Sequence, residues 1–92
     1  MSAKKSTKLS GYLKAIGDEN RLSILNLLKQ GPLCVCEIFP KLDIPQNLAS
    51  HHLKVLKDNG LVESIRKGTK IIYSPKKANI TRYQKLLTET IE

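Results

Sequence analysis

The segment from Pro45 to Asn59 constrains the fold of this chain most strongly, because its residues divide into two faces at helical spacing. With about 100° between successive residues, one side of a helix over this segment is apolar. That side carries Leu48, Ala49, His52, Leu53, Val55 and Leu56. The opposite side carries Gln46, Asn47, Ser50, His51, Lys54, Lys57 and Asp58. The pattern predicts a helix that packs on a small body through its first face and exposes polar groups on its second.

Three shorter helices are predicted ahead of this segment. The first is indicated by an apolar stripe formed by Leu9, Tyr12, Leu13 and Ile16. Asp18 can cap the second helix, which Gly31-Pro32 ends. Pro32 also suits the first position of a third helix, which we expect to run to Leu42. Residues 1–8 are polar and basic without periodicity, so we expect a flexible basic arm at 1–8 and one folded domain at 9–92.

A hairpin and a last helix are predicted after Gly60. The segments 61–65 and 70–74 have the composition of strands, and the basic turn between them contains Gly68, which tolerates a positive φ. The last helix is indicated by an apolar line of Ile80, Tyr83, Leu87 and Ile91. The expected fold is therefore mainly α with a two-stranded β wing. Four helices, two strands and a fifth helix in this order make a winged helix-turn-helix.

The charge of the chain is strongly one-sided. It carries 16 Lys and Arg against 8 Asp and Glu, a formal charge of +8 over 92 residues. Between Lys41 and Lys85, ten basic residues and three acidic ones account for +7 of that excess. Such a bias favours an acidic partner, most commonly nucleic acid, although a merely solvated surface is the alternative. Three Tyr, one Phe and no Trp argue against the stacking platforms of single-strand binders, so double-stranded DNA is the expected partner.

The polar face of the 45–59 helix suits a major groove, where amide, hydroxyl and imidazole groups read base edges while cations hold phosphates. The expected base-reading residues are Gln46, Asn47, Ser50 and His51. The expected phosphate contacts are Lys54, Lys57, Arg66, Lys67 and Lys70, the last three on the wing. His52 falls within the apolar face, so we expect a core histidine with a satisfied ring rather than a ligand.

Other classes of protein fit the sequence poorly. The apolar runs are too short to span a membrane, and no apolar stretch follows the first residues to make a signal peptide, so we expect a cytoplasmic protein with no membrane partner. The sequence has no Ser-His-Asp set, no paired carboxylates and no glycine-rich phosphate loop. We therefore expect no enzyme.

Cys34 and Cys36 are the only thiols of the chain, and thiolates are soft metal ligands. In a helix that starts at Pro32, Cys34 lies in the first turn, where free amides favour a thiolate. Residues two apart diverge by about 200°, which disfavours a disulfide and requires the helix start to unwind if one ion binds both sulfurs. Sensing of a soft metal or metalloid, thiol redox sensing and simple packing all remain open for this pair.

The run from Ile16 to Ser74 resembles the ArsR/SmtB-type winged-helix repressors. Residues 17–25 (GDENRLSIL) look like the family's opening of the second helix, and residues 33–38 (LCVCEI) look like its metal box. Residues 46–62 (QNLASHHLKVLKDNGLV) match the recognition stretch most closely. The resemblance implies a homodimer held by the first and last helices, which binds an inverted-repeat operator until a metal or metalloid ion lowers its affinity for DNA.

The sequence departs from the metal-sensing members of that family at several points. Arsenite-type members usually have a third cysteine where this chain has Phe39, and residues 1–8 supply no further cysteine. Residues 79–92 contain no His, which disfavours zinc sensing at the last helix. No obligatory cofactor is expected, and the candidate inducers are arsenic(III), antimony(III) or a soft metal ion at Cys34 and Cys36. The alternatives are an effector-independent DNA binder and a winged helix that binds protein instead of DNA.

Overall fold

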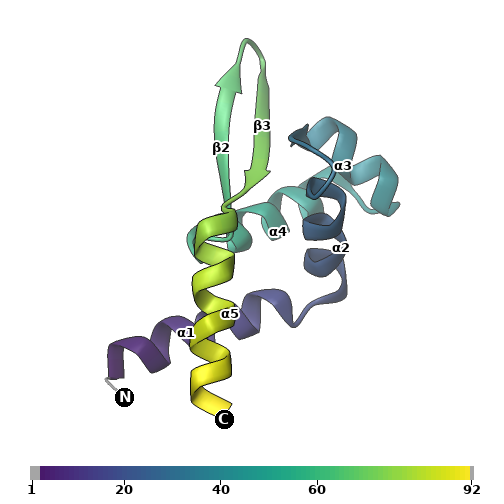
Figure 1. Cartoon of the computed structure of the whole chain (residues 1–92). Coiled ribbons are helices and arrows are strands. Elements are labelled where there is room, and N and C mark those ends of the chain that lie inside the picture. The colour runs from purple at the N-terminus through teal and green to yellow at the C-terminus, as the bar shows by residue number, and fades with distance from the viewer. Residues whose placement is uncertain (1–2, 92) are drawn as a thin grey trace.

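The computed structural model of the chain describes residues 3–91 and confirms the winged helix-turn-helix (Figure 1). The helices are α1 (Ala3–Ile16), α2 (Glu19–Leu28), α3 (Val35–Leu42), α4 (Gln46–Asp58) and α5 (Lys77–Ile91). The strands are β1 (Leu33–Cys34), β2 (Val62–Lys67) and β3 (Lys70–Pro75). The β2–β3 hairpin projects from one end of the molecule, and both termini lie toward the other end.

Local signals explain where the central helices begin and end. The carboxylate of Asp18 accepts a hydrogen bond from the backbone N–H of Arg21 at 3.1 Å and so caps α2 as predicted. Helix α4 starts after Pro45, which lacks a capping side chain, but the Pro45 carbonyl accepts from the backbone N–H groups of Leu48 and Ala49. Gly60 ends α4 with a φ of 71°, a left-handed conformation that glycine adopts without strain.

The core lies where α2, α3, α4 and the start of β2 meet. The most deeply buried large side chains, each no more than 1% exposed, are Ile24, Leu28, Ile38, Leu53, Leu56, Leu61 and Val62. The predicted apolar face of α4 therefore packs inward, except that Leu48 remains 37% exposed. Because α4 is held through one face only, its opposite face is free to meet a partner.

The sheet has a third strand that the sequence did not predict. Leu33 pairs with Tyr73 and Cys34 with Ile72, which gives the antiparallel order β1-β3-β2. The third helix therefore starts at Val35, and the prediction that it starts at Pro32 is wrong. The extended backbone of these two residues pairs with the hydrogen-bonding groups on the free edge of β3. This tertiary pairing outweighs the local preference of Pro32 for the first position of a helix.

Helix α1 is longer than expected and packs on α5. It begins at Ala3, which corrects the expected arm for residues 3–8, while residues 1 and 2 lie outside the described residues. Alanine and lysine favour helices intrinsically, so a helix forms there without an apolar stripe. The rings of Tyr12 and Tyr83 stack with centroids 4.8 Å apart, which joins α1 to α5. No helix within residues 3–91 has the length and apolar character needed to cross a bilayer.

Candidate nucleic-acid interface and cysteine site

The predicted reading face of α4 is exposed along its whole length. The side chains on this face are Gln46, Asn47, Ser50, His51, Lys54 and Lys57, and all of them are exposed. Amide, hydroxyl and imidazole groups occupy the first turns, and the two lysines follow. The buried side of the same helix carries Ala49, Leu53 and Leu56 at 0% exposure, so the helix cannot rotate to hide its polar face without emptying the core.

The hairpin adds a second cationic surface. Gly68 turns the chain with a φ of 61°, and beside it Lys67 lies directly opposite Lys70 while Arg66 lies opposite Ile71. All three cations are exposed. Like charges that face each other across two strands destabilise a hairpin. A fold that keeps two facing lysines at an exposed turn is suited to an anionic partner.

Two hydrogen bonds connect the lysines of α4 to their surroundings. The Nζ of Lys57 donates to the Oγ of Ser64 on β2 at 2.8 Å, so helix and wing touch at this point. The Nζ of Lys54 lies 3.0 Å from a carboxylate oxygen of Asp58, and both side chains are more than half exposed. Exposed pairs of this kind are weak, so phosphate can replace Asp58 at little cost.

His52 points away from the reading face and is 6% exposed, as predicted for a core histidine. Its Nδ1 accepts a hydrogen bond from Nη1 of Arg21 at 3.1 Å and lies 3.9 Å from Oδ1 of Asp18. Burial lowers the pKa of His52, and Arg21 adds to this effect while Asp18 opposes it. The pKa of Asp18 is lowered chiefly by the hydrogen bond from the backbone N–H of Arg21. The ring is therefore neutral at physiological pH.

Cys34 and Cys36 are joined as a disulfide, which contradicts the prediction that their geometry disfavours one. The reason is that Cys34 is not helical: with φ −83° and ψ 162° it is the cap of α3, so its side chain does not follow the helical direction. The two Cα atoms are 5.2 Å apart, within the usual range for a disulfide. The same backbone removes the need to unwind a helix before both sulfurs meet one ion, so that expectation is also wrong.

Glu37 is a third potential ligand that the sequence analysis missed. Its Oε1 accepts the backbone N–H of Cys34 at 3.1 Å, and its carboxylate lies within 4.8 Å of both sulfurs. Within residues 3–91, no other three Cys, His, Asp or Glu side chains bring their ligand atoms within such a short distance of one another. Donors around one tetrahedral zinc ion are roughly 3.3–3.8 Å apart, so the reduced site needs only small shifts to hold an ion of this kind. The spacing of three residues between Cys34 and Glu37, typical of a capping box, is the signal that could have found it.

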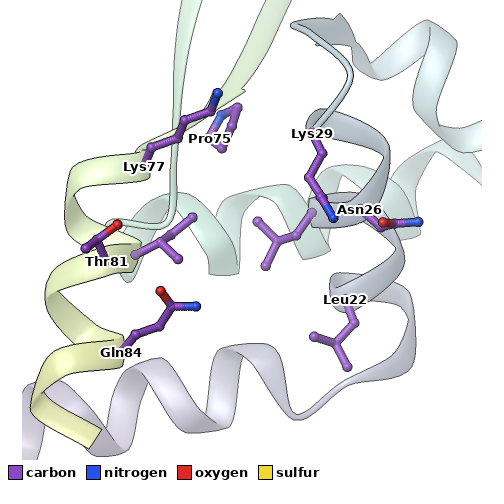
Figure 2. Close-up of a pocket in the computed structure, with 9 residues that line it drawn as sticks. Leu22, Asn26, Lys29, Pro75, Lys77, Thr81 and Gln84 are labelled. Atoms are coloured by element: carbon purple, nitrogen blue, oxygen red, sulfur yellow. The ribbon is translucent and has the colours of Figure 1, made fainter. Parts of the chain in front are cut away.

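An open groove of about 630 Å³ separates α2 from α5 (Figure 2). Leu22 and Leu25 line it from α2, and Ile80 lines it from α5. Lys29, Lys77 and Gln84 stand around its rim in Figure 2. Leu22 is 52% exposed, although it belongs to the apolar side of α2. None of the residues that line this groove belongs to α4.

Comparison with known proteins identifies the class. A helix-turn-helix transcriptional regulator of Methanocaldococcus jannaschii is 46% identical over 66 residues, which cover 71% of this chain and 74% of the relative. The model of the family described as "Bacterial regulatory protein, arsR family" matches residues 18–64, half of the chain. The chain belongs to the arsR family of bacterial regulatory proteins. The match begins at the cap of α2 and ends within β2, so it contains both α4 and the cysteine site of this arsR-family chain.

Two arsR-family relatives are named for resistance functions. The arsenical resistance operon repressor of Staphylococcus xylosus is 42% identical over 72% of this chain, and the chain spans 64% of that protein's length. The cadmium resistance regulator of Listeria innocua is 38% identical over 85% of this chain, and the chain spans 66% of its length. The chain thus corresponds to about two thirds of the length of these relatives.

Solved structures agree with the arsR-family assignment. An ArsR-like transcriptional regulator from Rhodococcus superposes with a TM-score of 0.87 at 25% identity, covering 96% of this chain and 83% of that one. The homodimeric winged helix-turn-helix DNA-binding domain of a Mycobacterium bovis protein superposes with a TM-score of 0.79 at 31% identity, covering 98% and 86%. The fold is therefore that of arsR-family regulators over almost its whole length.

Proposed function

We propose that this chain is a transcriptional repressor that binds an inverted-repeat operator as a homodimer. The observation that carries the proposal is that α4 is held in the core by one face while the other presents Gln46, Asn47, Ser50 and His51 beside a cationic wing. These four residues read bases, whereas Lys54, Lys57, Arg66, Lys67 and Lys70 hold phosphates. A repressor bound to chromosomal DNA acts in the cytoplasm.

The dimer forms through α1 and α5. Large apolar side chains remain exposed on both helices, with Leu13 at 39% and Ile91 at 73%, and no residue of α5 is fully buried. A second copy would cover these surfaces, and one superposable relative is homodimeric. A two-fold dimer presents its reading helices to successive major grooves about 34 Å apart, which requires an inverted-repeat site.

Reduced Cys34 and Cys36, with Glu37 as third ligand, hold the inducer. Trivalent arsenic and antimony prefer three thiolate ligands, so a set of two thiolates and one carboxylate should bind them more weakly than three thiolates would. The same set also suits cadmium or zinc. The names of the Staphylococcus and Listeria relatives support an arsenical or cadmium signal. If an ion takes the Glu37 oxygen that now accepts the backbone N–H of Cys34, it would weaken the cap of α3 and the β1 pairing beside it.

The proposal is tested with the reduced protein and DNA from its own promoter region. We expect binding that weakens steeply with salt, by roughly 10³–10⁵ between 50 and 200 mM if the dimer neutralises about 6–10 phosphates. Binding to no duplex at any salt concentration would refute the DNA-binding role. Arsenite and cadmium are then titrated while thiolate absorbance and operator release are followed together.

Variants separate the inducer site from the DNA-binding surface. Cys34→Ser and Cys36→Ser should bind operator normally and fail to release it, whereas Glu37→Gln, which removes the charge of the third ligand, should lower the affinity for the ion. Glu19→Gln, which removes an exposed carboxylate from α2, is the matched control. Unchanged release in both cysteine variants would show that the cysteines only pack and that the regulator has no inducer at this site.

A further inference from the structure

The guanidinium of Arg21 lies where three helices meet. Its Nε donates to the carbonyl of Ala15 at 2.6 Å, and its Nη2 donates to that of Lys14 at 3.2 Å, so it caps the last turn of α1. Its Nη1 donates to Nδ1 of His52, in the middle of α4. One side chain of α2 therefore ties the end of α1 to the reading helix.

The chemistry of this contact fixes the state of the His52 ring. A guanidinium has donors and no acceptor, so Nδ1 must accept and the ring hydrogen must be on Nε2. The charged or titratable groups that face the ring are Arg21 and Asp18 from the start of α2 and His51 from α4 itself. Arg21 and His51 disfavour a protonated ring and Asp18 favours one, but protonation would turn the acceptor into a donor facing another donor.

We propose that Arg21 is a positioning residue for DNA recognition, because it joins the last turn of α1 to His52 and so sets the angle at which α4 meets the operator. This inference rests on the proposed function, in which α1 belongs to the dimer interface and α4 reads DNA. In a two-fold dimer the spacing of the two reading helices depends on how each α4 is held relative to α1. Acid strong enough to protonate the buried His52 ring breaks this contact and loosens the hold of α1 on α4.

Arg21→Met tests the link by removing all three donors while keeping an unbranched side chain of similar bulk. We expect operator affinity to fall by about tenfold, the lower end of what losing a hydrogen bond to a charged group costs, and random-duplex affinity to change by less than about twofold. Lys29→Met is the matched control, since it removes an exposed charge from the far end of the same helix, outside the proposed dimer helices and the proposed DNA contacts. Arg21→Lys should recover part of the loss, because one ammonium cannot reach all three acceptors.

The pH profile separates positioning from a merely structural role. In a His51→Gln background, lowering the pH from about 7.5 to below the depressed pKa of His52 should reduce the ratio of operator to random-duplex affinity by about tenfold. The same ratio should be flat when Arg21→Met is added. If Arg21→Met lowers only the thermal stability and leaves both the ratio and its pH profile unchanged, the proposal is overturned.

Nitrogen NMR of the wild-type protein without DNA supplies a measurement that needs no variant to fold. At about pH 7.5, His52 should be the neutral tautomer with its hydrogen on Nε2. A hydrogen on Nδ1 would overturn the positioning contact while leaving DNA binding intact. Wild-type protein that binds no operator would instead refute the proposed function, whatever the tautomer.

Discussion

Replacing Lys67 by Gln should weaken DNA binding and stabilise the protein at the same time. Lys67 faces Lys70 across the wing, and both side chains are exposed. Facing like charges cost roughly 0.2–1 kcal/mol, and solvent screening places this pair near the lower end. The free energy of unfolding should therefore rise by about 0.2–0.5 kcal/mol in the variant.

The effect on DNA binding follows from counterion release. The five proposed phosphate contacts per chain become about ten in a dimer, which sets an upper limit near −9 for the slope of log affinity against log salt concentration. Lys67→Gln removes two of them per dimer and should reduce the magnitude of that slope by about 1.8. Fluorescence anisotropy of a labelled operator across a salt series gives the slope, and urea unfolding gives the stability.

Lys85→Gln is the matched control, because it removes the same charge from an exposed position on α5, away from α4 and the wing. Its slope and its stability should both match the wild type. If Lys67→Gln and Lys85→Gln have equal slopes, the wing does not contact phosphates and the reasoning from the facing lysines fails.

Three further predictions concern stability and use urea unfolding. Burial lowers the pKa of His52 and a backbone N–H lowers the pKa of Asp18, so the unfolded chain binds protons more readily at both groups. The free energy of unfolding should be greatest above about pH 6.5 and should fall with acidification, first as His52 protonates and again below about pH 4, and a flat profile would contradict this. Leu53→Ala should cost about 2–5 kcal/mol because Leu53 is 0% exposed, whereas Leu22→Ala, at 52% exposure, should cost below about 1 kcal/mol. Gly60→Ala should cost about 1–2 kcal/mol, since its φ is 71° and a Cβ would lie 3.2 Å from Nδ2 of Asn79, and wild-type stability in this variant would exclude strain at the turn.

The sequence predicted the central elements well because their signals are local. The helix from Pro45 to Asn59 is confirmed as α4 (Gln46–Asp58), since a strong two-faced pattern leaves one orientation on the core. The hairpin is confirmed too, with Gly68 at its turn. The start of α3 could not be predicted, because Leu33 and Cys34 become a strand only when β3, forty residues later, offers its edge.

The geometry of the cysteine site also could not be predicted from the local sequence. The sequence singled out Cys34 and Cys36 as candidate ligands, but the relative direction of their side chains depended on a helix start that was placed too early. Once Cys34 is extended, the two sulfurs meet, and Glu37 reaches both of them from the first turn of α3. The base-reading and phosphate residues keep the status of predictions, since an exposed side chain shows access to DNA and not contact with it.

The position of Cys34 explains how one short segment can serve two surfaces. Its backbone pairs with Ile72 in the wing, and its N–H is capped by Glu37 at the start of α3, which leads through the Asp43–Pro45 turn into α4. Any chemistry that rearranges the Cys34 backbone must disturb the base of the wing and the helix before α4 together. The residues that would bind an inducer therefore lie between the wing and α3, the helix that precedes α4. A change at this site would reach both proposed DNA-binding surfaces directly. If an ion at Cys34 and Cys36 displaces Glu37 from the Cys34 N–H, the β1–β3 pairing should loosen, and faster backbone amide exchange at Ile72 and Tyr73 with cadmium than without it would show this.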